Sequence, residues 1–129
     1  MTVLIVCLFI SLLLPILAKA PVAYAMNKLG GYDNRHPRAQ QAQLTGFGAR
    51  ALAAHKNAFE AVIFFAPAVL VAIATNNTGS TIQTLAMSHI AARVIYNLLY
   101  VFDINVMRSV VWGVGYISSL AIVFLCIPG

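Results

Sequence analysis

Two short stretches of this sequence contain most of the side chains that could do chemistry. RALAAHKNAFEAV at 50–62 contributes Arg50, His55, Lys56, Asn57 and Glu60. SHIAARVIYNLLYVFD at 88–103 contributes His89, Arg93, Tyr96 and Tyr100, and Arg108 follows it. Guanidinium, ammonium and amide donors outnumber the carboxylates that could satisfy them within the chain. That excess is typical of a site that binds an acidic ligand.

The spacing of these residues predicts that they line helix faces. Positions 50, 53, 57, 60 and 64 recur at three- and four-residue intervals, so on a helix they form one stripe. Positions 89, 93, 96 and 100 do the same. His55 and Lys56 flank the first stripe. We therefore expect two helices with polar faces turned toward protein or water.

The composition places those helices in a membrane. The 129 residues are 61% hydrophobic and 9% charged, whereas soluble domains have about 25% charged residues. Four apolar segments, 3–26, 48–75, 80–102 and 104–127, each reach the ~20 residues that cross a ~30 Å hydrocarbon core. Segments in lipid must pair their own backbone groups, which favours helices. We predict an all-α integral membrane protein, a single four-helix domain over 1–129.

The first segment could also be a cleaved signal peptide, because 18–20 and 23–25 both resemble A-x-A cleavage sites. No basic residue precedes Lys19, however, and the apolar run is longer than a signal peptide needs. We interpret it as a membrane helix. Cys7 and Cys126 are interpreted as small buried side chains rather than a disulfide or metal pair.

The positive charges predict the orientation. Lys28, Arg35 and Arg38 lie in the first connection, and Arg108 follows the third, while the second connection, 76–80, has no charge. Lys and Arg are enriched on the cytoplasmic side, so connections one and three should be cytoplasmic and both termini outside. Charges this sparse, without interleaved aromatic residues, argue against nucleic-acid binding.

Depth along the helices predicts a partner for the buried charge. Counted from Thr75 at 1.5 Å per residue, Glu60 lies ~22 Å from the outer end, or ~8 Å inside the cytoplasmic boundary. Arg93 lies ~15 Å from Asp103, and an unpaired charge at mid-membrane costs ~2.5–3.5 kcal/mol. We predict that Glu60 and Arg93 pair across the second and third helices, and that exchanging both partners restores folding.

Such a pair could serve only to fix the register of two helices. The surplus of neighbouring donors favours a binding site instead. A metal site made from His36, His55 and His89 is not expected, because these residues lack ligand spacing and differ in depth.

The sequence resembles the MAPEG family in three features: R-x-x-x-A-H-K-N-x-x-E-x-x-x-x-F from Arg50 to Phe65, R-x-x-Y-x-x-x-Y at 93–100, and Arg108. This is the membrane-associated group of eicosanoid and glutathione metabolism, which includes microsomal glutathione transferases. The resemblance covers essentially the whole chain. It implies a homotrimer of four-helix bundles, in small members placed in the bacterial inner membrane, with glutathione bound between subunits near the cytoplasm.

The resemblance also implies a role for each site residue. Arg50, Asn57 and Glu60 would hold the charged ends of glutathione, with His55 and Lys56 beside them. Arg93, Tyr96 and Tyr100 would complete the pocket. Arg108 is the candidate for stabilising the thiolate, with Tyr100 next to it as a second catalytic candidate, and Lys28 could reach in from a neighbouring subunit. Ala53 stands where the family has a second arginine, which removes one expected contact.

The chemistry of the donors agrees with this ligand. Glutathione carries two carboxylates, and a free thiol with a pKa near ~8.5 is mostly protonated at neutral pH. A nearby guanidinium favours the thiolate. The sequence is therefore interpreted as a membrane transferase or peroxidase that joins glutathione to, or uses it to reduce, a lipophilic second substrate taken from the membrane lipids.

Two other functions remain open at this point. The bundle could be a non-catalytic protein that binds a lipid or an anionic metabolite. It could also be a small multidrug-type transporter, which has similar length and helix number. Those transporters have an essential acid on the first helix, however, and this first helix has none.

Overall fold

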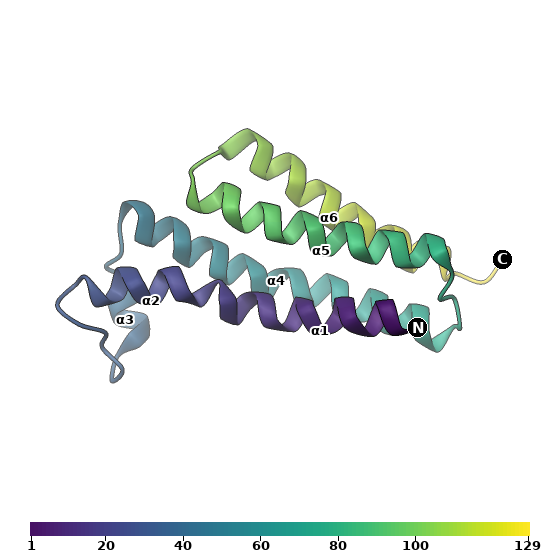
Figure 1. Cartoon of the computed structure of the whole chain (residues 1–129), viewed down its shortest axis with the longest axis horizontal. Helices are drawn as coiled ribbons and strands as arrows, with labels where there is room; N and C mark the ends of the chain where they lie inside the picture. The colour runs from purple at the N-terminus through teal and green to yellow at the C-terminus, as the bar shows by residue number, and fades with distance from the viewer.

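The computed structural model describes all residues, 1–129, and is built only from helices. In chain order they are α1 (Thr2–Leu17), α2 (Lys19–Asn27), α3 (Pro37–Gln41), α4 (Gly46–Ala74), α5 (Ser80–Val101) and α6 (Asn105–Leu125). The long helices lie side by side, with α1, α2 and α4 on one side and α5 and α6 on the other (Figure 1). The all-α prediction is confirmed.

The first expected helix is broken in two, which the prediction of one helix over 3–26 did not anticipate. α1 ends at Leu17 and α2 begins at Lys19. Pro21 lies four residues after Leu17, so it has no N–H to give to the Leu17 carbonyl and its ring crowds that carbonyl. The helix is therefore interrupted at Ala18, although this residue keeps right-handed helical dihedrals and 2–27 still forms one span.

Three parts of the chain are long and apolar enough to cross a membrane: 2–27, 46–74 and 105–125. α5 has the length but is not among them, because Gln83, His89, Arg93 and Asn97 lower its hydropathy. Large apolar side chains elsewhere face outward, such as Ile63, which is 74% exposed. An outer surface of this kind fits lipid and not water.

The connections are closed by specific backbone geometry. A residue with positive φ follows two positions after the end of α4 and of α5: Asn76 at 56° and Asp103 at 60°. In both cases the next amide bonds back to a carbonyl five residues earlier: Asn77 N–H to Ala72 O at 2.9 Å, and Ile104 N–H to Leu99 O at 2.9 Å. This is the Schellman helix ending. It reverses the chain in a few residues and makes α5 and α6 a tight hairpin.

One buried glutamine orders the first connection. Gln40 Nε2 donates to Gly31 O at 2.7 Å and to Met26 O at 3.2 Å, and its Oε1 accepts from Asp33 N at 2.9 Å. The Asp33 carboxylate in turn accepts from the backbone N–H groups of Arg35 and His36. The connection therefore forms a fixed cap at one end of the bundle (Figure 1).

The bundle has an apolar half and a polar half along its length. The apolar cluster lies toward the end that holds both termini; its members are Leu4, Cys7, Phe65, Ala68, Val69, Ala72, Ile82, Ala86, Ile122 and Cys126. A smaller cluster of Val22, Met26 and Ala51 joins α2 to α4 near the opposite end. Along α4, Asn57 and Glu60 lie between Ala51 of the smaller cluster and Phe65 of the larger one.

Candidate functional site

Arg93 is the centre of the polar half. Its side chain is only 2% exposed, and its Nη2 donates to Asn57 Oδ1 at 2.6 Å. Asn57 Nδ2 then donates to Glu60 Oε2 at 3.0 Å. Two consecutive hydrogen bonds thus connect Arg93 on α5 to Glu60 on α4, with the uncharged Asn57 amide between them.

The predicted direct pair between Glu60 and Arg93 is therefore wrong. The only ion pair within 4.0 Å in the chain joins His36 to Asp33 in the first connection. Asn57 lies one helical turn before Glu60 and has both an acceptor and a donor, so it fills the space between the charges. Glu60 itself is exposed on the surface of the single chain.

Two tyrosines, in contact with each other, lie between Arg93 and Arg108 at the start of α6. The Arg93 guanidinium lies 4.2 Å from the centre of the Tyr96 ring. Tyr96 and Tyr100 meet edge to face at 5.7 Å, and the Arg108 guanidinium lies 4.2 Å from the Tyr100 ring. The tight α5–α6 hairpin brings Arg108 to this position. We call Arg50, Asn57, Glu60, Arg93, Tyr96, Tyr100 and Arg108 the arginine–tyrosine site.

Arg50 lies at the same end of the bundle. Its Nε donates to Val101 O at 3.4 Å, at the C-terminal end of α5. A cation is favoured there because the last carbonyls of a helix are unpaired and carry partial negative charge. The site thus has three guanidinium groups and one carboxylate, and three minus one leaves a net charge of +2.

His89 shares the α5 stripe but takes part in helix packing. It is 1% exposed and stacks on Phe65 with ring centres 4.0 Å apart. Its Nδ1 is 3.0 Å from Gly115 O, and since a carbonyl can only accept, this nitrogen donates. His89 therefore joins α4, α5 and α6 beneath the arginine–tyrosine site.

His55, Lys56 and Lys28 lie apart from the arginine–tyrosine site within one chain. His55 Nδ1 donates to Pro15 O on α1 at 2.7 Å, and His55 and Lys56 line a cavity of about 610 Å³ beside α1, α2 and α3. Lys28 lies at the end of α2, with its ammonium 4.6 Å from the Tyr24 ring. Their glutathione roles remain predictions from the resemblance.

An apolar groove runs along the other side of α5. It has a volume of about 410 Å³ and is lined by residues of α1, α2, α4 and α5, among them Leu14, Pro21, Ala54 and Val101. Asn97 is its one polar side chain. Asn97 Nδ2 donates to the Arg93 carbonyl, while its Oδ1 is buried without a partner.

Sequence reasoning missed several residues that shape the site. Asn97 lies four residues after Arg93, so its position on the same helix could have been read from the spacing. Gln40 carried no signal, because a single glutamine in a polar connection looks like a solvated residue. Lys19 and Arg38 line the cavity with His55, but Lys19 was considered only in weighing a signal peptide and Arg38 only as a charge that sets orientation.

Comparison with known proteins supplies a family. A family model described as the MAPEG family matches residues 3–128. No curated protein and no solved structure matched the chain in the corresponding searches.

Proposed function

Because the chain belongs to the MAPEG family, we propose that it is an integral membrane, glutathione-dependent transferase or peroxidase. The observation that carries this proposal is the run of Arg93, Tyr96, Tyr100 and Arg108, which has two guanidinium groups and no carboxylate paired with either. Guanidinium groups without a carboxylate partner can bind the carboxylates of an anionic ligand of the size of a small peptide. Glutathione has two carboxylates and one ammonium.

Each group of the arginine–tyrosine site has a role in this proposal. Arg50 and Arg93 bind the two carboxylates of glutathione, and Glu60 binds its ammonium. Asn57 keeps Glu60 and Arg93 apart, so that the exposed Glu60 carboxylate has no cation beside it and the buried Arg93 Nη1 has no partner within the chain. A homotrimer, as the resemblance implies, would cover the exposed Glu60 with a neighbouring subunit, and Lys28 would approach from that subunit.

Arg108 has the catalytic role. The glutathione thiol loses its proton to solvent water, and the Arg108 guanidinium stabilises the thiolate that remains. The Tyr100 ring under that guanidinium keeps it in place, and the Tyr100 hydroxyl is available as a second donor to the sulfur.

Two reactions follow from a stabilised thiolate. In conjugation the sulfur attacks an electrophilic carbon of a lipophilic substrate, the C–S bond forms, and the leaving group departs with the bonding electrons. In reduction the sulfur attacks a lipid hydroperoxide, releasing the lipid alcohol and glutathione sulfenic acid. A second glutathione then reduces the sulfenic acid, which gives glutathione disulfide and water.

We also propose that α5 crosses the membrane with the three apolar spans. Its buried Arg93 bonds to α4 and its buried His89 to α6, and outward residues such as Val94, Ile95 and Leu98 are apolar. Four crossings put the arginine–tyrosine site and the first connection on the cytoplasmic side, where the Lys and Arg residues gather.

The test is to purify the chain in detergent and measure glutathione binding together with conjugation of an aryl halide. We expect wild type to do both. Arg108→Ala should keep binding and lose conjugation by about a hundredfold, which is the usual cost of one stabilising donor. Arg35→Gln, a cation in the first connection, is the control and should behave as wild type. Absence of glutathione binding in the wild type would refute the proposal.

Ala53 and the apolar groove favour a second candidate function, binding without catalysis. The family's second arginine is absent, and the groove beside α5 is large enough for a lipid chain. A non-catalytic protein that binds glutathione or a lipid would show binding without conjugation in the same experiment.

A further inference from the structure

The cavity beside α1, α2 and α3 has a cationic lining that the proposed function does not use. It measures about 610 Å³ and has Lys19, Arg38, His55 and Lys56 among its lining residues, with no acidic side chain. Lys19 belongs to α2, Arg38 to α3, and His55 and Lys56 to α4. Four basic side chains from three elements therefore meet around one space. We call this space the basic pocket.

The positive charge of the basic pocket is not balanced inside the chain. None of Lys19, Arg38 and Lys56 forms an ion pair, because the single ion pair is His36 with Asp33. Lys19 has only the Tyr32 ring nearby, 5.8 Å from its ammonium. His55 is held in place by the Pro15 carbonyl. The pocket thus brings together the cations Lys19, Arg38 and Lys56 without an anion.

The same pocket has an apolar side. Ile16, Leu52 and Phe59 line it together with the cations. Ile16 is 64% exposed and Phe59 is 50% exposed on the outer surface of the apolar helices α1 and α4. A ligand that fills the pocket meets cations at one end and lipid-facing hydrocarbon at the other.

We propose that the basic pocket binds the phosphate head group of an anionic phospholipid, with an acyl chain against Ile16 and Phe59. Basic pockets between membrane helices on the cytoplasmic side recognise such head groups. A free phosphate would satisfy the cations but not the apolar side, which is the reason for choosing the lipid. The pocket uses a different face of α4 from Arg50, Asn57 and Glu60, so this site does not depend on the proposed function.

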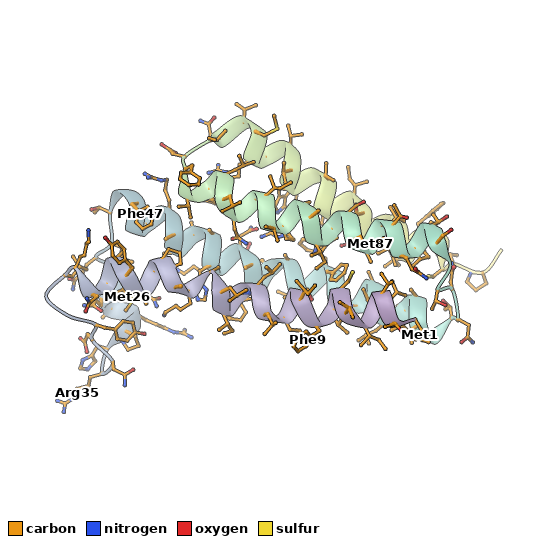
Figure 2. All side chains as sticks on the ribbon, in the orientation of Figure 1. Met1, Phe9, Met26, Arg35, Phe47 and Met87 are labelled. Carbon is orange, nitrogen blue, oxygen red and sulfur yellow. The ribbon has the colours of Figure 1, made fainter.

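The test is native mass spectrometry of the full chain in detergent, titrated with phosphatidylglycerol or with phosphatidylcholine. Wild type should retain phosphatidylglycerol in preference. Lys19→Gln and Arg38→Gln should each weaken that binding roughly fivefold, since a cation near a lipid surface contributes about 1 kcal/mol. Arg35→Gln is the matched control, because Arg35 belongs to the same connection but points away from the helices (Figure 2).

Three results would overturn the proposal. The first is equal binding of phosphatidylglycerol by wild type and by the Lys19→Gln, Arg38→Gln double variant. The second is displacement of the lipid by inorganic phosphate at matched concentration, which would assign the pocket to a soluble anion. The third is displacement by glutathione, which would make the pocket part of the arginine–tyrosine site. The charge-keeping variant Lys19→Arg, Arg38→Lys must retain the lipid, and a thermal unfolding curve of each variant separates lost binding from lost folding.

Discussion

At the scale of single residues, the site depends on how one buried cation is satisfied. Arg93 is almost fully buried, and the group that accepts its hydrogen bond is the Asn57 amide, with Glu60 one step further away. A buried charge needs hydrogen bonds more than it needs a counter-charge in direct contact. The hydrogen bonds through Asn57 leave the Glu60 carboxylate exposed, while Arg93 stays buried with its Nη1 lacking a partner within the chain.

This arrangement predicts different effects for two substitutions on the same helix. Asn57→Leu removes the acceptor that Arg93 uses and should lower the free energy of unfolding by ~1.5–3 kcal/mol, the range for a hydrogen bond to a charged group. Glu60→Gln should change stability by less than ~0.5 kcal/mol, because Glu60 is exposed. Thermal unfolding in detergent measures both. A larger loss in Glu60→Gln than in Asn57→Leu would instead support direct pairing.

The same residues show what spacing can and cannot predict. The intervals among Arg50, Asn57 and Glu60 correctly assign them to one helix face, because helix geometry fixes that relation. They do not fix which side chain reaches Arg93 first, since that depends on how α4 and α5 pack. The choice of Glu60 as partner rested on depth along the helices and on charge, and the intervening amide was not considered as a competitor.

At the scale of elements, the α5–α6 hairpin positions Arg108. The connection is only 102–104, and it closes because Asp103 adopts a positive φ of 60°. Tyr100 and Arg108 lie on opposite sides of this turn and meet as a result. The same helix ending at Asn76 closes the α4–α5 connection, where none of the arginine–tyrosine site residues lie.

The two turns provide a matched pair of tests. Asp103→Val and Asn76→Val should each lower stability by about 1–2 kcal/mol, because a branched side chain resists the left-handed conformation. Asp103→Gly and Asn76→Gly should be tolerated at both sites. We expect only Asp103→Val to reduce glutathione conjugation as well, since only that turn holds Arg108 over Tyr100. Equal loss of conjugation in Asn76→Val would show a general effect of instability.

Most helices could be anticipated from hydropathy because lipid leaves the backbone no other structure. The break at Ala18 was readable in principle, because Pro21 removes the donor for Leu17. The α3 turn and the Gln40 contacts were not, because they depend on the carbonyls of Met26 and Gly31 being brought close by the fold. Local sequence contains no sign of those distant partners.

At the scale of the whole molecule, the bundle is divided along its length. The apolar cluster occupies the half near both termini, and the arginine–tyrosine site and the basic pocket occupy the other half. A membrane chain with its charges at one end can contact water there and lipid along its sides. Both proposed ligands would then bind at the same end of the bundle.

Cysteine labelling tests this arrangement. In a variant with Cys7 and Cys126 replaced by alanine, Ser80→Cys should react with an impermeant maleimide added outside intact cells. Arg35→Cys and Asn105→Cys should react only after the cells are opened. Ser80 is the first residue of α5, and Asn105 is the first residue of α6, just beyond the other end of α5. Labelling of both from the same side would show that α5 does not cross the membrane.

The most direct test of the central claim is the ultraviolet absorbance of the glutathione thiolate when glutathione is mixed with the purified protein at neutral pH. The account predicts a thiolate band in the wild type and its loss in Arg108→Ala, with glutathione still bound by equilibrium dialysis. Arg108→Lys should restore part of the band, because it keeps the positive charge. A band of equal size in wild type and Arg108→Ala, or bound glutathione with no band in the wild type, would contradict the account.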